Sequence, residues 1–267
     1  MRSVKYIIIM VFLTGMFMTC SCESQNAMAS DATSEKSAGK DVAEPNTTIS
    51  ELGFEVDTIK TNGGDLKITF VGHGTLMFEF AGKIIHVDPV GREADYTKMP
   101  KADLILITHE HGDHLDPKAI ETIKKEETQM ILTQACSQKV SGGQVIKNGD
   151  TKTVMGLKIE AVPAYNPDKN FHPKGKGNGY VITFGDKKVY VAGDTENIPE
   201  MKNLKNIDIA FLPMNLPYTM SPEMAADAAK SFKPKILFPY HYGQTDTNQL
   251  VELLKDSKDI KVLIRKM

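Results

Sequence analysis

The chain has 267 residues, of which 41% are hydrophobic and 25% charged, a composition typical of a globular protein that can bury a core. Lysine and arginine number 32 against 34 aspartate and glutamate residues, which gives a formal net charge of −2. That near balance argues against nucleic acid as an obligate partner and leaves a small-molecule, lipid or peptide substrate open.

The first 22 residues have the pattern of a signal segment. Two basic residues precede an apolar run at 6–18, which is shorter than the ~20 residues that a membrane-spanning helix needs. The segment resembles a bacterial lipoprotein signal, in which Cys22 is favoured over Cys20 as the lipidated residue because the small Ser21 precedes it. We therefore expect an exported protein that an N-terminal lipid anchor holds at a bacterial membrane. Cleavage further along would give a periplasmic or secreted protein, and an uncleaved anchor is the third alternative.

Residues 23–55 are rich in small and polar side chains, and large apolar residues are rare up to about residue 50. Such a segment buries too little apolar surface to offset the entropy of ordering, so we expect a disordered linker. The predicted globular domain covers residues 56–267. Cys136 is its only cysteine, so no intramolecular disulfide can form there, and we expect a buried side chain without a catalytic role.

The first half of the predicted domain contains short apolar and β-branched runs separated by turns, which indicates an antiparallel meander. These runs lie at 66–71, 75–80 and 83–87, and a wholly apolar strand follows at 104–107. Asp116 and Pro117 then have the positions of an N-cap and a first helical residue. Further strands are expected at 130–132 and 157–162.

The second half begins with a hairpin and then alternates strands with helices. Two strands at 180–184 and 188–191 flank a Gly-Asp turn. Ser221 is expected to cap an alanine-rich helix that runs to about residue 232. The remaining expected elements are strands at 207–212, 236–238 and 261–264 and a short helix at 249–254. A meander followed by this alternation indicates an α/β, or layered α+β, fold class.

Residues 108–116, directly after the apolar strand, concentrate side chains that bind metals. His109, His111 and His114, three of the seven histidines in the chain, lie here with Asp113 and further carboxylates. Neutral imidazoles and carboxylates at this density are ligands of Zn²⁺, Mn²⁺ and Fe, whereas ordinary loops rarely concentrate histidine. The segment therefore predicts a metal site.

Other potential ligands follow apolar strands elsewhere in the chain. They are His73, Asp88, Asp194 and His241. Because ligand crevices in α/β sheets lie beyond the carboxyl ends of strands, these side chains could converge with the cluster and form a site for two metal ions. His86 lies inside a strand, and we expect a structural role for it.

The pattern His-x-His-x-Asp-His at 109–114 resembles the signature of the metallo-β-lactamase superfamily. Asp194 in Gly-Asp-Thr and His241 in Pro-Tyr-His resemble its later ligand motifs and occur in the same order. Gly-His-Gly-Thr at 72–75 and Val-Asp-Pro at 87–89 look like the branch that contains L-ascorbate-6-phosphate lactonase and N-acyl-phosphatidylethanolamine phospholipase D. The resemblance extends over essentially the whole predicted domain and implies an αββα sandwich with metals at the sheet edge.

The resemblance also implies two divalent metal ions, zinc in the first place, with manganese or iron as alternatives. The implied ligands are His109 and His111 for the first ion, Asp113, His114 and His241 for the second, and Asp194 as a bridge. The family usually has a further histidine in a Pro-Ala-aromatic-His context, where this chain has Asn166. We expect His172, in the glycine-rich loop that follows, to complete the first site. The alternative is a surface histidine, with water completing the metal.

Such a site implies a hydrolase in which a hydroxide held by two metals attacks an ester, lactone or phosphodiester bond, with an amide as a further option. Asp113, Asp194 and His73 are the expected catalytic residues. One of four tyrosines near the site could donate to an oxyanion. They are Tyr165, Tyr218, Tyr240 and Tyr242.

Two other classes compete with a hydrolase. One is a metal-binding module of the same fold without activity, which the full ligand set disfavours. The other is a diiron redox protein, a branch that typically has glutamate at the position of His111 and carries a flavodoxin domain. The expected substrate is a small molecule or a lipid. The basic loop at 169–176 could meet an anionic group or could simply be solvated.

Overall fold

The computed structural model describes residues 49–267, so the predicted signal segment and most of the predicted linker lie outside the described residues. Ile49, Leu52 and Phe54, at the end of the predicted linker, pack against one face of the domain. In the part of the chain that the structure describes, no helix combines the length and the apolar character that crossing a membrane requires.

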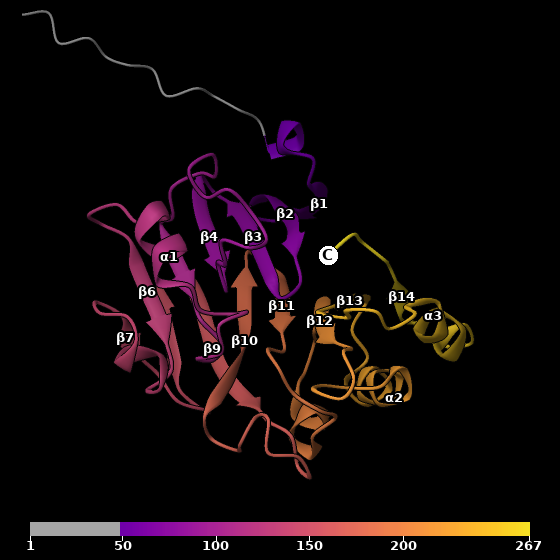
Figure 1. Ribbon diagram of the computed structural model, residues 1–267. Helices are drawn as coiled ribbons and strands as arrows, with labels where there is room; N and C mark the ends of the chain where they lie inside the picture. Colours follow the sequence, from indigo (N-terminus) through magenta and orange to yellow (C-terminus); the bar gives the residue numbers. More distant parts are fainter. Residues whose placement is uncertain (1–48) are drawn as a thin grey trace, which may run out of the picture. The chain divides into compact units, whose positions relative to one another are not determined.

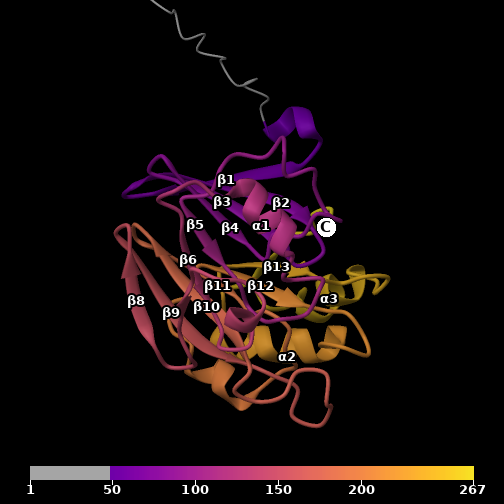
Figure 2. The same ribbon diagram turned by 60° about the vertical axis from the view of Figure 1, so that its left-hand side comes forward.

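Two seven-stranded sheets face each other (Figures 1 and 2). The first contains, in spatial order, β1 (Glu55–Thr61), β2 (Gly64–Gly72), β3 (Thr75–Phe80), β4 (Lys83–Val87), β5 (Leu104–Leu106), β6 (Gln129–Leu132) and β7 (Gln144–Val145). The second contains β8 (Thr151–Val154), β9 (Leu157–Ala164), β10 (Gly177–Phe184), β11 (Lys187–Val191), β12 (Ile209–Pro213), β13 (Ile236–Tyr240) and β14 (Lys261–Val262).

The two sheets have the same topology. In each, the first four strands form an antiparallel meander, and the remaining strands continue in parallel from the fourth. Strands β2, β4 and β5 therefore run in one direction, and so do β9, β11 and β13. Their carboxyl ends meet at one edge of each sheet, where loop residues from distant parts of the sequence can converge.

Helices cover the outer faces of both sheets. They are α1 (Pro117–Ile123), α2 (Pro222–Phe232) and α3 (Asn248–Leu254), with 3₁₀ turns η1 (Ile49–Leu52), η2 (Cys136–Gln138) and η3 (Pro199–Asn203). One apolar cluster lies between the sheets, a second joins α1 to the first sheet, and a third joins α2 and α3 to the second sheet. The layers are thus helix, sheet, sheet and helix, which confirms the predicted αββα sandwich.

Aromatic rings fill much of the space between the sheets. Phe211 and Phe238 of the second sheet stack at 5.2 Å between ring centroids, and Phe70 of the first sheet lies 4.9 Å from Phe238. All three side chains are almost fully buried, and burial of each large side chain contributes about 2–3 kcal/mol. This packing fixes the two sheets against each other and hence the two sets of loops at their edge.

The predicted helix starts are confirmed. Asp116 accepts hydrogen bonds from the first turn of α1, and Ser221 accepts one from Met224 N in α2. The sequence interpretation missed β1, β7 and β8. The β1–β2 hairpin turns at Asn62 and Gly63, a dipeptide that favours such turns, but the many polar residues of β1 obscure its strand pattern.

Candidate metal centre

The carboxylate of Asp88, just after β4, organises the segment that follows β5. It is fully buried, and its backbone has a positive φ of 48°. Its Oδ1 accepts a hydrogen bond from Thr108 N at 2.8 Å, and its Oδ2 accepts bonds from Thr108 Oγ1 at 2.6 Å and His114 Nδ1 at 2.8 Å. These bonds brace the ligand loop, and Asp88 is not among the grouped potential metal ligands.

This bracing fixes which ring nitrogen of each histidine is available. Because Thr108 Oγ1 donates to Asp88, it accepts from His109 Nδ1 at 3.0 Å. The Nδ1 atoms of His109 and His114 are both occupied, so their Nε2 atoms face the centre of the site. A hydrogen bond on one ring nitrogen is the usual way in which proteins orient the other towards a metal.

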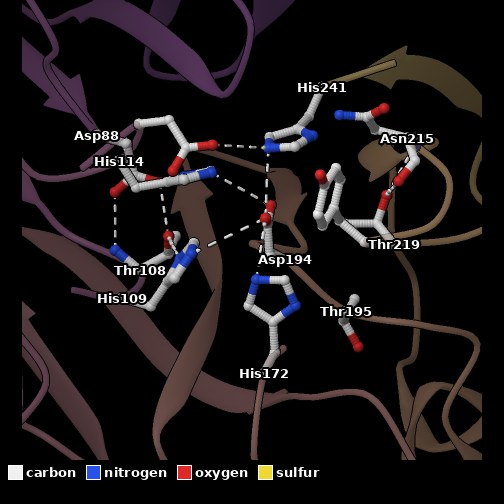
Figure 3. Close-up of polar contacts among 12 residues, drawn as sticks. Asp88, Thr108, His109, His114, His172, Asp194, Thr195, Asn215, Thr219 and His241 are labelled. Carbon is white, nitrogen blue, oxygen red and sulfur yellow. Dashed lines mark hydrogen bonds and ion pairs between the residues drawn. The ribbon is translucent and has the colours of Figure 1, made fainter. Parts of the chain in front are cut away.

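Asp194, which follows β11, lies at the centre of four imidazole rings (Figure 3). Its Oδ1 is 3.3 Å from His114 Nε2. Its Oδ2 is 3.2 Å from His172 Nε2, 3.3 Å from His241 Nε2 and 3.8 Å from His109 Nε2. Three loops of the second sheet and one loop of the first sheet meet here, as the shared direction of their strands predicts.

The potential ligands form overlapping groups. His109, His111 and His172 make one group, and His109, His114 and Asp194 make a second. A third group contains His73, Asp113, His114 and His241. Within each group, one potential ligand atom of every residue lies within 4.8 Å of the others. All seven predicted metal ligands are therefore brought together, and His73 joins them.

His172 reaches the centre because Asn166 holds its ring. Asn166 Nδ2 donates to the carbonyl oxygen of Tyr218 at 3.0 Å, so its Oδ1 faces His172 and accepts a hydrogen bond from Nδ1. The backbone N–H of Asn166 also donates to the carbonyl oxygen of His172 at 2.8 Å. Asn166, at the position where the family pattern has a histidine, thus orients His172.

Two lysines of the same loop hold it in place. Lys169 pairs with the buried carboxylate of Glu196. Lys174 Nζ lies 2.8 Å from Glu200 and donates to the hydroxyl of Tyr165 at 3.2 Å. These pairs occupy two of the cations that could have met an anionic substrate.

His73 lies in the turn between β2 and β3, where its backbone has a positive φ of 51°. Its Nε2 donates to Asp113 Oδ2 at 3.1 Å, and its ring lies on that of His241 with centroids 3.7 Å apart. The neighbouring Gly74 is required by space, because a Cβ there would lie 2.5 Å from the ring of His114. The Gly-His-Gly sequence therefore serves close packing around two histidines.

The electrostatics of the cluster favour a bound cation. Burial lowers the pKa of His109 and of His111, so both rings are neutral at pH 7 and have a free lone pair. Burial alone would raise the pKa of Asp194, but the facing His114 and His241 hold it well below its usual range. The facing rings of His241 and His73 lower the pKa of Asp113 in the same way. The site thus has ionised carboxylates beside the neutral rings of His109 and His111, whereas Asp194 and Asp88 raise the pKa of the buried His114 well above its ordinary value.

Several buried polar atoms at the centre make no hydrogen bond within the described structure. They are the Nε2 atoms of His109, His114 and His241 and Oδ1 of Asp194. Buried polar atoms without a partner are rare in proteins, because each costs free energy comparable to a lost hydrogen bond. Imidazole nitrogens and a carboxylate oxygen that face one another without a partner fit divalent metal ions.

A cleft of about 360 Å³ opens beside this cluster. Its walls are formed by His111, Asp113, Phe171, His172, Asp194, Asn215, Tyr218 and His241. Of the four tyrosines considered from the sequence, only Tyr218 lines it. Tyr165 and Tyr242 have their hydroxyls bonded elsewhere, and Tyr240 is fully buried. The sequence analysis missed Asn215, although it follows the end of β12 and side chains beyond strand ends were expected to line the site.

His86 is outside the cleft, as expected. Its ring is fully buried, and Nε2 donates to the carbonyl oxygen of Pro100 at 3.0 Å. Burial lowers its pKa to about 4, so the ring is neutral in the folded protein at pH 7. Cys136 is buried, as predicted.

The fold and the cluster define a protein of the metallo-β-lactamase superfamily, and the chain belongs to it: residues 67–241 match the family described as a beta-lactamase superfamily domain. The relatives are metal-dependent hydrolases. A UPF0173 metal-dependent hydrolase from Thermococcus kodakarensis is 30% identical over 217 residues, which cover 74% of this chain and 96% of the relative. This chain is accordingly a metal-dependent hydrolase.

Solved structures agree with this assignment. A candidate metal-dependent hydrolase from Parabacteroides distasonis is 55% identical, with a TM-score of 0.78, and the match covers 80% of this chain and 99% of that one. Igni18, a metallo hydrolase from the archaeon Ignicoccus hospitalis, is 27% identical, with a TM-score of 0.64 over 75% of this chain and 95% of its own.

Proposed function

We propose that the chain binds two divalent metal ions and hydrolyses an ester, lactone or phosphodiester bond in the cleft beside them. The observation that carries this proposal is the set of buried, unpartnered nitrogen and oxygen atoms around Asp194. In the proposal, the first ion is held by His109, His111 and His172, and the second by Asp113, His114 and His241. Asp194, which contacts rings of both groups, would help to hold both ions.

Two divalent ions in such a site lower the pKa of coordinated water towards neutral and polarise the bond under attack. The residues of the chain have separate tasks. Asp88 and Thr108 hold the rings of His109 and His114, so these ligands need no rearrangement when they bind. Asp113, whose side chain is 34% exposed, faces the cleft and would orient the attacking water by accepting a hydrogen bond from it.

His73 is proposed to position Asp113 rather than to bind a metal. Its Nε2 donates to Asp113 Oδ2, and its ring contacts that of His241. Both contacts act on residues of the proposed second site. His73 thereby sets the direction of the carboxylate that faces the substrate. Zinc is the proposed metal, because nitrogen ligands predominate and carboxylates complete the set, and manganese and iron are the alternatives to be tested.

Metal analysis combined with a hydrolysis panel tests this function. Purified protein should contain two equivalents of metal and should hydrolyse at least one of a set of esters, lactones and phosphodiesters. A chelator, or the substitution Asp194→Asn, should reduce the rate to that of the uncatalysed reaction. Asp227→Asn is the matched control, because Asp227 is an exposed carboxylate on α2.

Three outcomes would contradict the proposal. Two bound metals with no hydrolysis of any panel member would indicate a binding module. Two irons with oxygen consumption would indicate a redox protein. Hydrolysis that survives both the chelator and Asp194→Asn would remove the metal mechanism altogether.

We also propose that the chain is exported and anchored to a bacterial membrane through Cys22, where it meets a small-molecule or lipid substrate. The support comes from the sequence of residues 1–22 alone. Metabolic labelling with a fatty acid should mark the wild-type chain, and Cys22→Ala should lose the label and leave the membrane fraction. Retention of the label in Cys22→Ala but not in Cys20→Ala would assign the anchor to Cys20 instead.

A further inference from the structure

Two exposed aromatic rings stand beside the proposed metal centre. Phe171 is 41% exposed and Tyr218 is 46% exposed, and they contact each other edge to face with ring centroids 5.0 Å apart. Both line the cleft that also contains His172 and Asp194. A single exposed apolar side chain is ordinary, but two exposed aromatic rings in contact at the wall of a polar cleft mark a binding surface.

This aromatic wall, Phe171 and Tyr218, is held in a fixed position relative to His172. Asn166 donates to the carbonyl oxygen of Tyr218 and accepts from the ring of His172, the residue next to Phe171. The N–H of Tyr218 in turn donates to the carbonyl oxygen of Asn215 at 2.9 Å. The wall is therefore preorganised beside the proposed first metal, so little ordering entropy would oppose the binding of an apolar group.

Apart from the proposed metal ions, the walls of the cleft offer little positive charge to a substrate. Among the residues that the structure describes, neither lysine nor arginine lines it. Lys169 and Lys174 of the neighbouring loop are paired with Glu196 and Glu200. Lys176 lies outside the cleft, in a narrow adjoining recess that shares His172 and Asp194 with it. Recognition of a carboxylate or a phosphate group away from the scissile bond usually needs such a cation.

We infer that the substrate is a small ester or lactone with an uncharged apolar group, an aryl ring or a short alkyl chain, that packs against Phe171 and Tyr218. This inference rests on the proposed function. A volume of about 360 Å³ is at the lower end of the range for small-molecule sites, so the substrate is small. The apolar group lies next to the scissile bond because the wall adjoins His172.

Two ester series test the inference. One consists of methyl acetate, methyl butyrate, methyl hexanoate and methyl hydrogen succinate, and the other of acetate esters of ethanol, butanol and hexanol. Proton release gives kcat/KM for each ester. At about 0.8 kcal/mol for each buried methylene, kcat/KM should rise about threefold to fourfold per methylene in at least one series, until the cleft is filled. Methyl hydrogen succinate should be at least about tenfold slower than methyl butyrate.

The variants Phe171→Ala and Tyr218→Ala should flatten this dependence on chain length and should keep wild-type metal content. Val251→Ala is the matched control, because Val251 is an exposed apolar residue on α3, away from the cleft, and it should keep the wild-type slope. Thermal unfolding of each variant identifies any that has lost its fold, and Tyr218→Leu then replaces Tyr218→Ala, with partial retention of the slope expected.

The failure of the inference and the failure of the proposed function give different results. Metal-dependent ester hydrolysis with no dependence on chain length, or with the same slope in the aromatic variants, overturns the inference alone. A preference for the succinate ester, or hydrolysis of phosphodiesters only, also overturns the inference and leaves the proposed function standing. If no member of the wider panel is hydrolysed in a metal-dependent way, the proposed function fails and the inference fails with it.

Discussion

Replacing Asn166 with alanine should weaken the binding of one metal ion much more than that of the other. The Asn166 side chain is buried, and it accepts from the ring of His172 and donates to the carbonyl oxygen of Tyr218. The loss of two hydrogen bonds at about 1 kcal/mol each amounts to about 2 kcal/mol, or about a 30-fold loss of affinity. That value lies within the roughly tenfold to hundredfold loss of metal affinity that follows substitution of residues hydrogen-bonded to metal ligands.

Titration of metal-free protein with zinc, in competition with a chromogenic chelator, measures this effect. The wild type should show two binding steps. In Asn166→Ala, the zinc affinity of one step should fall about 30-fold, while that of the other changes by less than about threefold. Asn166→Asp should restore the step, because its carboxylate still accepts the hydrogen bond from His172. Asn203→Ala, at an exposed position on η3, is the matched control.

The reasoning would be refuted if Asn166→Ala left both steps unchanged, since His172 would then need no orienting partner. It would also be refuted if both steps weakened equally while Asn203→Ala was normal. That result would indicate that Asn166 supports the whole site and not one ligand.

Three further predictions concern packing, pH and stability. Gly74→Ala should lower metal affinity and the melting temperature, because the new Cβ would lie 2.5 Å from the ring of His114. The pKa of His86 is about 4 when folded and 6.5 in its ordinary state, so below pH 6.5 the unfolded chain binds a proton that the folded chain excludes. The free energy of unfolding therefore falls as pH falls from 6.5 towards 4, by about 2 kcal/mol at pH 5. In urea unfolding, His86→Gln should lack this contribution to the acid sensitivity. Arg265→Ala should cost about 2 kcal/mol, because Arg265 makes paired hydrogen bonds to Asp57 and lies over two buried rings.

Each of these predictions has its control. Gly112→Ala is matched to Gly74→Ala, since a Cβ at Gly112 meets no atom within 4 Å, and equal losses in both variants would exclude the steric explanation. If His86→Gln shows the same difference in unfolding free energy from the wild type at pH 7 and pH 5, His86 does not cause the acid sensitivity. Lys255→Ala breaks an exposed ion pair with Glu252 and should change stability by less than about 0.5 kcal/mol.

The sequence predicted those parts of the site that depend on local spacing or on strand ends. The cluster at 109–114 is one continuous segment, and His73, Asp194 and His241 each follow an apolar strand whose end could be identified. The position of His172 was a hypothesis from the sequence, because nothing in its loop shows that Asn166 turns the ring inward. That information lies in contacts between residues far apart in the chain, such as Asn166 with Tyr218.

The misses have the same physical cause. Strand β1 was not predicted because its side chains alternate between exposed and half-buried positions at the sheet edge, so its apolar content is low. Asn215 and the exposure of Phe171 depend on how loops meet across the cleft. A sequence pattern records burial along one element, and it carries no information on which side chains a folded cleft leaves uncovered.

The division of the ligands between the two sheets has a consequence for the order of assembly. The first sheet and its loops supply His73 and the cluster at 109–114, whereas His172, Asp194 and His241 come from the second sheet. Neither half of the chain alone contains all of these side chains, so the proposed two-metal set is complete only after the halves dock. Ions bound as proposed would link the two sheets, so separation of the sheets would release metal.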